Sequence, residues 1–136
     1  MFKLESIAQI LQENGFGKMG KTIFINNMPE GEEGILILEQ TYGNRVNPQL
    51  PKYYNDSGFQ VIVRNKKFEK ARQIAYNIME ILTIEKSKQV DNIWVNQCYA
   101  RRLPQIYARM DGNMLEASIN FLLNYVDNES FARGKK

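Results

Sequence analysis

The stretch FQVIVRNKKFEKARQIAYNIMEIL, residues 59–82, carries the clearest structural signal in the chain. Apolar side chains alternate from residue 59 to residue 64, which predicts a strand with one face fully buried and the other partly buried. From residue 68 onward apolar side chains recur at helical spacing, which predicts an amphipathic helix over residues 67–83. The helical positions are Phe68, Ala71, Ala75, Ile78 and Leu82, with Ile74 and Ile81 beside them. The chain therefore combines strands with helices.

Upstream of this stretch the pattern predicts one more helix and two more strands. Apolar side chains recur at helical spacing as far as Gly15, a residue suited to closing a helix, so we expect residues 3–14 to be helical. The apolar runs at residues 22–25 and 35–38 are separated by turn-forming residues and predict a pair of strands.

Residues 42–57 form the longest stretch that fits neither period, because they are rich in tyrosine, glycine, proline and asparagine. This composition predicts a long, ordered or binding-competent loop. Tyrosine and arginine are enriched at protein interfaces, so we expect a contact loop. Ordinary packing of the loop against the body is the alternative. The residues concerned are Tyr42, Arg45, Lys52, Tyr53 and Tyr54.

The carboxyl-terminal third contains one clear strand and one ambiguous segment. Residues 93–99 are rich in strand-forming side chains and predict a fourth strand. Residues 107–126 fit both periods, because their leucines could define a helix face while alternate positions could define a strand face. On these residues alone, helix is slightly favoured. Residues 128–136 are polar and are expected to be disordered.

Length and composition fit one globular domain. The chain has 136 residues, of which 43% are hydrophobic and 24% charged, and such values are typical of a folded protein with one core. We expect a single domain over residues 1–128 and a polar basic tail over residues 129–136. With one cysteine, Cys98, and no histidine, neither an internal disulfide nor the usual zinc ligand sets can form. No export signal or membrane span is recognisable, so we expect an intracellular protein without a metal.

The net charge of +3 is concentrated at the carboxyl terminus. Arg133, Lys135 and Lys136 account for three of the 18 basic residues, so residues 1–130 hold 15 basic (18 minus 3) and 15 acidic residues. A protein that binds nucleic acid normally carries its excess charge on a folded face. We therefore expect neither membrane binding nor sequence-specific nucleic-acid binding.

One basic cluster does lie within the folded part, where the third strand meets the second helix. It comprises Arg64, Lys66, Lys67, Lys70 and Arg72, offset by Glu69, and its local charge is +4 (five minus one). Positive charge at a helix amino terminus opposes the helix dipole, which suggests a partner, either an acidic protein surface or phosphate. A solvated face is the alternative reading.

Residues 15–22, GFGKMGKT, match the pattern of a phosphate-binding loop. That chemistry requires the glycines to follow a strand and open a helix, so that backbone amides converge on phosphate. Here a helical pattern precedes the glycines and a strand pattern follows at residues 23–25. The strand candidates also end in Glu39, Arg64 or Tyr99 rather than in a magnesium-binding aspartate. We interpret this segment as a helix-to-strand connection.

Nothing else in the sequence indicates catalysis. Cys98 has no histidine to activate its thiol, and the serines lack the same partner. Glu30, Glu32 and Glu33 form a solvated run between strands rather than a shared pocket. We therefore expect a protein that is not an enzyme and uses no cofactor.

The order of these segments resembles the tail terminator, or minor capsid, protein family of tailed bacteriophages. The resemblance covers about residues 3–127, and no single motif carries it. The motifs are Met28-Pro29, Gly34–Gly43, Leu50-Pro51, Gly58–Arg64, Ala71–Leu82, Leu103–Tyr107, Asp111–Asn113 and Glu116–Phe121.

The resemblance implies an α+β fold, in the order α-β-β-β-α-β-β, with a mixed, mostly antiparallel sheet and two main helices packed on it. It also implies a strand at residues 114–126, paired through the Asp111–Asn113 turn with a strand through Ile106 and Ala108. Asp-Gly is a strong hairpin dipeptide, which favours the same arrangement independently.

The resemblance further implies a structural virion protein at the neck, assembled in the host cytoplasm. Members form a ring, commonly a hexamer, that stops tail tube polymerisation and contacts the tail tube protein and the head–tail connector or stopper protein. The contact residues we expect are Tyr42, Arg45, Lys52, Tyr53, Tyr54, Arg64, Lys66 and Lys67. The alternatives are a head-completion or connector-stopper protein and, less favoured, a small nucleotide- or nucleic-acid-binding domain.

Overall fold

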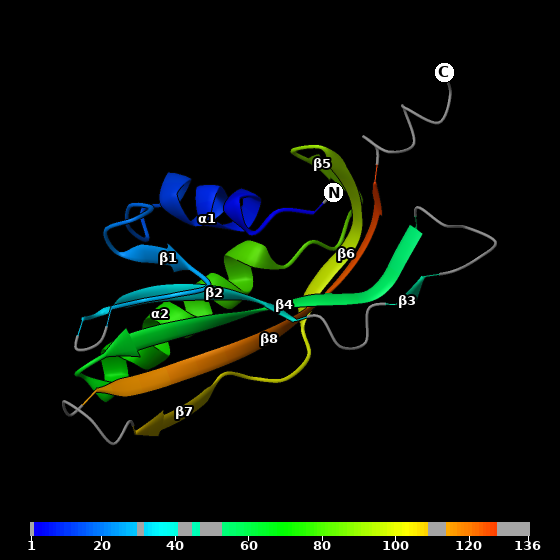
Figure 1. The fold of residues 1–136 in the computed structure, drawn as a ribbon. Coiled ribbons are helices and arrows are strands. Elements are labelled where there is room, and N and C mark those ends of the chain that lie inside the picture. The colour runs from blue at the N-terminus through cyan, green and yellow to red at the C-terminus, as the bar shows by residue number, and fades with distance from the viewer. Residues whose placement is uncertain (1, 30–31, 41–44, 47–52, 109–113, 128–136) are drawn as a thin grey trace.

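In a computed structural model, which describes residues 2–29, 32–40, 45–46, 53–108 and 114–127, two helices lie on one face of an eight-stranded sheet (Figure 1). The sheet is mixed and mostly antiparallel, so the fold is α+β. The elements are α1 (Leu4–Glu13), β1 (Ile23–Ile25), β2 (Gly34–Gln40), β3 (Arg45–Val46), β4 (Tyr53–Asn65), α2 (Phe68–Leu82), β5 (Lys88–Val90), β6 (Ile93–Ala100), β7 (Gln105–Ala108) and β8 (Leu115–Asp127).

Two 13-residue strands, β4 and β8, form the centre of the sheet. They pair antiparallel, with Val61 opposite Ile119. The far edge of β4 pairs with β2 and β3, and the far edge of β8 pairs with β6 and β7. At one end of the sheet β1 runs parallel to β2, with Ile23 opposite Ile35. The order is β1-β2-β4-β8-β6-β5.

The helices form because each has an apolar stripe to bury against the sheet. Along α1 the buried positions are Leu4, Ile7, Ala8 and Leu11, and along α2 they are Ala71, Ala75, Ile78 and Leu82. Both sets belong to one core together with the inward side chains of the central strands. Each buried aliphatic side chain stabilises the fold by about 1.5–3 kcal/mol, so this core is the main source of stability.

The sequence-based elements are confirmed where the periodicity was clear. Both helices agree within one residue with the predicted ranges, 3–14 and 67–83, and all four predicted strands are present. The fold class is also confirmed. The element order is longer than expected, with four strands on each side of α2 instead of three before it and two after it. The short strands β3 and β5 were not anticipated.

The preference for helix over residues 107–126 was wrong. Residues 105–108 form β7 and residues 115–127 form β8, with Ala108 opposite Leu115. This is the hairpin that the family resemblance implied, although its turn at residues 109–113 lies outside the described part. Because β8 is buried on both faces along most of its length, its sequence shows no alternation that would identify a strand.

The predicted loop over residues 42–57 is also partly wrong. Residues 53–57 belong to β4, and residues 45–46 form β3, which pairs with β4. The pairing between β4 and β8 shifts register between Tyr54 and Ser57, so the strand continues through a polar, irregular sequence. Residues 41–44 and 47–52 lie outside the described residues, as does the predicted disordered tail at 128–136.

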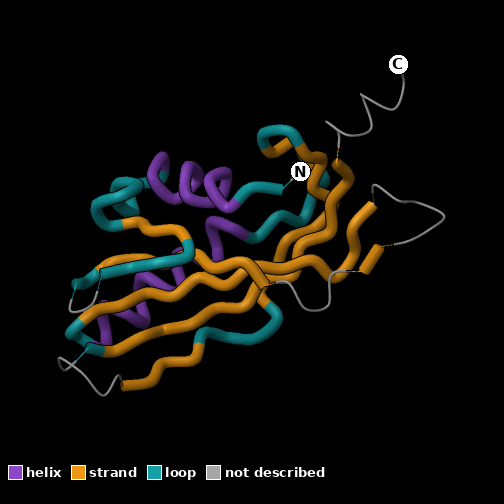
Figure 2. The backbone as a smooth tube through the Cα atoms, in the orientation of Figure 1, coloured by secondary structure: helices purple, strands orange, loops and turns teal. Residues whose placement is uncertain are grey.

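The sheet curls at the end that carries β5 and β6, so these strands bend toward α1 (Figure 2). The two-residue turn between them contains Asp91, whose φ of 53° lies in a region that aspartate tolerates. Ser6 Oγ on α1 donates a hydrogen bond to Asp91 Oδ2 at 2.9 Å. Two segments far apart in the sequence thus meet at the surface. Neither helix is long and apolar enough to span a membrane.

Candidate protein interface

The expected contact residues fall at the two ends of β4. Tyr53 and Tyr54 lie at its start, while Arg64 lies near its end, with Lys66 and Lys67 directly after it. A strand rises about 3.3 Å per residue, so the two groups are separated by roughly 35 Å along the strand. They do not form one surface.

At the start of β4 the tyrosines sit beside the short strand β3. Arg45 lies opposite Asn55 and Val46 opposite Tyr54. The Tyr54 ring stacks on Tyr125 of β8, with centroids 5.0 Å apart and an interplanar angle of 28°. Packing against the body therefore accounts for Tyr54.

Other predicted residues of this group are described less fully. Tyr53 and Arg45 are placed in strands by their backbone, and Tyr42 and Lys52 lie outside the described residues. Their part in an interface stays a prediction.

Tyr125 belongs to a row of aromatic side chains in the core. Phe2 lies 5.8 Å from both Tyr125 and Phe59, and Phe59 stacks on Phe121 at 4.9 Å. The pKa of Tyr125 is raised to about 12, mainly by burial and next by the neighbouring Tyr54, while a hydrogen bond with Ser57 acts in the opposite direction. Aromatic pairs add about 0.5–1.5 kcal/mol beyond their buried area, so this row fastens β4 to β8.

At the other end of β4, Arg64 lies inside the protein rather than on its surface. Its side chain is 5% exposed. Its Nε and Nη2 each donate to Glu116 Oε2 at 3.1 Å, and its Nη1 donates to the Pro29 carbonyl at 2.9 Å. The guanidinium therefore joins three segments of the chain. Arg64 does not belong to the exposed part of the basic cluster that the sequence suggested.

The exposed part begins two residues later, at the start of α2. Lys66, Lys67 and Lys70 are exposed and have no ion-pair partner among the described residues. Phe68 stands between them with 50% of its surface exposed. We call these four residues the α2 knob. It presents one apolar ring beside three lysines, with the exposed Glu69 in the same helical turn.

The start of α2 has no side-chain cap, although Glu69 lies in its first turn and the Lys66 amide donates to Glu33 Oε2 at 2.9 Å. Its N-cap is Lys67, and no side chain caps the helix. The Lys67 amide donates instead to Asn65 Oδ1 at 2.9 Å, one step before the helix begins. Unpaired amides at a helix start carry partial positive charge, which adds to that of the lysines.

Arg72 is also exposed, but its side chain interacts with two residues of its own helix. It lies 4.0 Å from the Glu69 carboxylate, and its guanidinium lies 5.5 Å from the centre of the Tyr76 ring. Because Arg72 has these two partners, we leave it out of the α2 knob.

A groove of about 560 Å³ runs between α1 and the turn from β5 to β6. It is lined by Glu5, Ser6, Gln9, Ile10, Glu13, Met19, Lys88, Gln89, Val90 and Asp91. Three of these residues are acidic and one is basic, so the groove is negative. We call it the acidic groove. Sequence reasoning missed it, because its two walls come from segments more than 70 residues apart.

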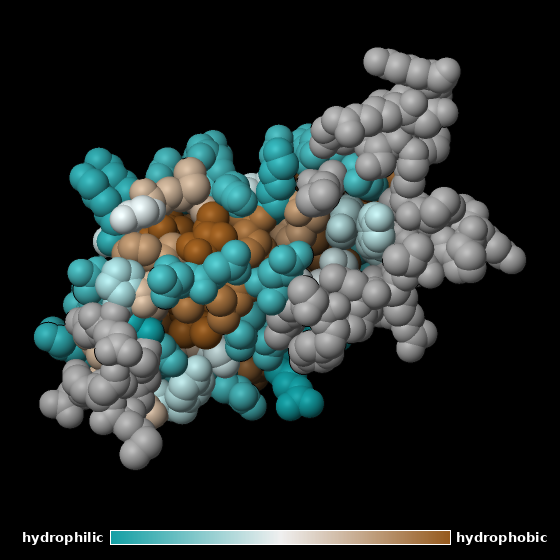
Figure 3. Space-filling model, in the orientation of Figure 1, coloured by the Kyte–Doolittle hydropathy of each residue, from teal (hydrophilic) through white to brown (hydrophobic). Residues whose placement is uncertain are grey.

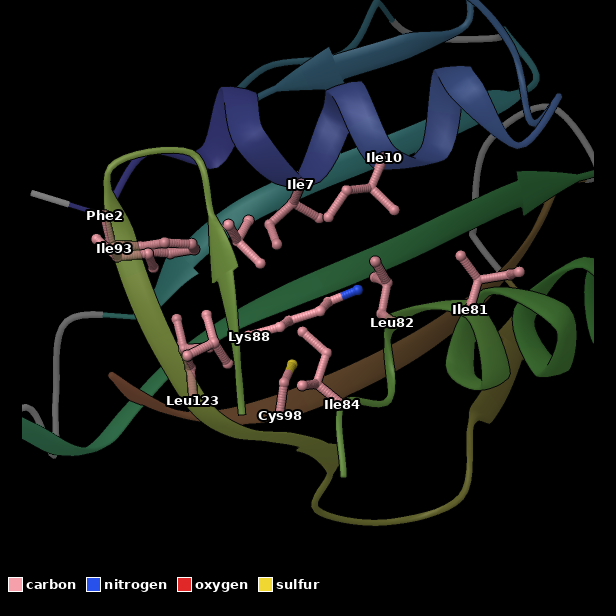
Figure 4. A pocket seen from close by; sticks show the side chains of 12 residues that line it. Phe2, Ile7, Ile10, Ile81, Leu82, Ile84, Lys88, Ile93, Cys98 and Leu123 are labelled. Carbon is pink, nitrogen blue, oxygen red and sulfur yellow. The ribbon is translucent and has the colours of Figure 1, made fainter. Parts of the chain in front are cut away.

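The groove borders a small apolar cavity of about 30 Å³ beneath the ends of the helices. Figure 4 shows the Lys88 side chain extending across this cavity toward Leu82, with Cys98 and Ile84 beside it. Cys98 is 2% exposed, and burial raises its pKa to about 12. A thiol in this state is a core side chain and not a nucleophile.

Several large apolar side chains are exposed on β6, on β7 and on the connection between them. Trp94 is 39% exposed, Tyr99 42%, Leu103 64% and Tyr107 44%. The alternation of residues 93–98, in which Ile93, Val95 and Cys98 are buried, leaves Trp94 on the other face and could have revealed this surface. Figure 3 shows apolar surface along the visible face as well, bordered by hydrophilic side chains.

The segment Gly15–Thr22 does not form a phosphate-binding loop. The amides of Lys21, Thr22 and Ile23 all donate to the Lys18 carbonyl at 2.9–3.1 Å, and that of Gly20 donates to the Ile23 carbonyl. The Lys18 amide donates in turn to Thr22 Oγ1 at 2.9 Å. These groups are therefore engaged inside a turn, and a strand follows them instead of a helix.

Two glycines of this segment have a structural role. Gly15 has a φ of 83° and closes α1. Gly17 has a φ of 148°, and a side chain there would collide with the Thr22 hydroxyl. Both positions need glycine for the turn itself, so the glycine pattern requires no nucleotide. Among the described residues no group of three or more acidic or cysteine side chains could hold a metal ion.

The family described as bacteriophage tail terminator protein matches residues 10–127. The chain belongs to this family. A solved structure described as the virion of a native gene transfer agent particle contains a similar chain, with a TM-score of 0.57 and 10% identity over 88% of this chain and 84% of that one. At this identity the likeness concerns the fold alone. A comparison with curated proteins gave no match. This tail terminator is thus a structural protein of the phage virion.

Proposed function

We propose that the protein forms a ring, of six subunits, at the head-proximal end of the phage tail. There it stops polymerisation of the tail tube and joins the tail to the head connector. The observation that supports this role is the family match over residues 10–127, which spans every strand and α2. The role needs no chemical reaction, and the ring would be assembled in the host cytoplasm.

The architecture suits repeated contacts. The short strands β1 and β5 end the sheet, and β3 and β7 lie beside its long central strands. Strand edges, exposed aromatic side chains and charged patches are typical contact surfaces. In a ring, many identical contacts add up although each is weak, so no single surface needs high affinity.

Sedimentation velocity and negative-stain microscopy of the purified protein test the proposal. We expect hexameric rings, either from the protein alone or once tail tube protein is added. A protein that stays monomeric at micromolar concentration, and that neither changes its sedimentation nor forms rings in the presence of tube protein, would contradict it.

A binding comparison separates this role from that of a connector-stopper. Immobilised protein should retain tail tube protein as well as the head connector protein. Retention of the connector without any binding of tube protein would overturn the proposed position on the tail.

A further inference from the structure

We propose that the ring contact joins two different surfaces of neighbouring copies, with the α2 knob of one copy seated in the acidic groove of the next. This inference rests on the proposed ring and names the surfaces that would build it. The occupant of the groove is thus a second copy of this chain.

The two surfaces carry opposite charge. Glu5, Glu13 and Asp91 give the groove three carboxylates, whereas the knob carries three lysines at the uncapped start of α2. Carboxylates beside a helix amino terminus are stabilising because they meet both the dipole and unpaired amides. The charge that is unfavourable within one copy becomes favourable between two.

The two surfaces also carry apolar side chains that can meet. Ile10, Met19 and Val90 also line the groove, and Met19 is 38% exposed. Phe68 is the apolar part of the knob and is 50% exposed. Stable interfaces place an apolar anchor at the centre and charged residues at the rim. Phe68 against Met19, surrounded by lysines and carboxylates, has this arrangement.

The basic residue of the groove does not block this fit. The Lys88 side chain extends across the neighbouring apolar cavity toward Leu82 (Figure 4). Long lysine side chains often cover apolar surface in this way while the ammonium reaches water. With three carboxylates against this one ammonium, the groove keeps a net negative charge.

The contact also has the symmetry that a ring needs. The α2 knob and the acidic groove share no residue, and they lie on different elements. In a linear row of copies joined by such contacts, the copy at one end has an unoccupied knob and the copy at the other end an unoccupied groove. Such contacts close into a ring when the rotation between neighbours allows it. A contact of this kind, unlike a two-fold one, is what a ring of six requires.

Charge reversal tests the contact on the full-length protein. The knob variant is Lys67→Glu/Lys70→Glu, and the groove variant is Glu5→Lys/Glu13→Lys. Like charges facing each other should weaken self-association of each variant by about 100-fold. The matched control is Arg101→Glu/Arg102→Glu, which changes two exposed basic residues elsewhere. It should assemble like the parent protein.

The decisive step is to mix the two variants. In an alternating ring every contact pairs opposite charges again, acidic knob with basic groove or basic knob with acidic groove. An equimolar mixture should therefore restore rings with an even number of subunits, measured by sedimentation velocity. This rescue cannot come from misfolded protein, so it distinguishes a broken contact from a broken fold.

The possible outcomes separate this inference from the proposed function. Loss of rings in each variant with rescue in the mixture supports the contact. Rings in both single variants, or no rescue in the mixture, would overturn the contact while leaving the ring intact. A parent protein that forms no ring with or without tube protein would overturn the proposed function itself.

A further variant examines the apolar centre. Phe68→Ala should weaken self-association by about 10-fold or more, because an aromatic anchor is lost. Leu103→Ala, which truncates a side chain that is 64% exposed on another surface, is the control. Equal association of both variants with that of the parent would count against Phe68 as the anchor.

Discussion

The end of β4 and the start of α2 place the same kind of side chain in opposite situations. Arg64 is 5% exposed and bonded to Glu116 and to a backbone carbonyl. Lys66 and Lys67, two and three residues later, are exposed without an ion-pair partner in the described part of the chain. One cluster of basic residues in the sequence thus contains a buried residue that stabilises the fold and exposed residues that are available for binding.

The largest change in stability is expected from replacing Arg64, the buried residue of this cluster. Arg64→Met removes the guanidinium that donates two hydrogen bonds to the buried Glu116 carboxylate, and this should lower the free energy of unfolding by about 3–5 kcal/mol. Urea unfolding followed by fluorescence measures the loss. Lys67→Met is the exposed counterpart and should change stability by less than about 0.5 kcal/mol. Similar losses for both variants would remove the distinction between the two regions.

Replacing both partners should be far less harmful than replacing one. In Arg64→Met/Glu116→Leu both members of the ion pair become apolar, so most of the stability lost in the single variant should return. The remaining loss, about 0.5–1.5 kcal/mol, would come from the lost hydrogen bond to the carbonyl of the exposed Pro29. A double variant as unstable as Arg64→Met would show that the ion pair is not the reason for the loss.

A smaller effect is expected from the buried thiol at alkaline pH. The pKa of Cys98 is raised from 9.0 to about 12 by burial, so the folded state disfavours the thiolate. Its stabilising contribution is complete below pH 9 and falls as pH rises toward 12, by about 1.4 kcal/mol per pH unit. Cys98→Val should make unfolding between pH 9 and 11 less dependent on pH. An unchanged slope would mean that this thiol does not contribute.

The smallest change in stability is expected from replacing the exposed lysines of the α2 knob. Lys67→Glu/Lys70→Glu replaces positive charge at the start of α2 by negative charge, which suits the helix dipole. The free energy of unfolding should rise by about 0.3–1 kcal/mol, measured by thermal or urea unfolding. A decrease of more than about 1 kcal/mol would mean that these lysines stabilise the folded copy itself. A gain in stability joined to a loss of association would mark them as interface residues.

The sequence predicted the helices well because their apolar side chains face one direction only. Over α2 the spacing of Ala71, Ala75, Ile78 and Leu82 gives the buried stripe directly, and the structure buries the same four residues. The strand after residue 59 was predicted for a similar reason, because its inward side chains alternate. Local periodicity is sufficient when an element buries a single face.

Two regions could not be predicted locally. Apolar residues occupy both faces of β8, so only its pairing with β4 and β6 determines that it is a strand. Residues 88–90 form β5 although two of the three are polar, because β6 offers a partner edge. Both strands form because they pair with segments distant in the sequence. For β8 the family resemblance implied the strand that the local pattern did not identify.

Two residues of the candidate interface could be singled out from the sequence. Lys66 and Lys67 were singled out from their position at a helix start, and the structure leaves both exposed. Arg64 looked equivalent because nothing in its own neighbourhood of sequence identifies Glu116, 52 residues away, as its partner. The acidic groove depends on contacts such as that between Ser6 and Asp91, 85 residues apart, so periodicity could not reveal it.

The most direct test of the proposed role is the length of tail tubes assembled from purified tube protein, measured by electron microscopy. Adding the protein at a ratio of one ring per tube should stop elongation and leave a ring at one end of each tube. The Lys67→Glu/Lys70→Glu variant should let tubes grow longer. Tubes that elongate equally with and without the protein would contradict the account.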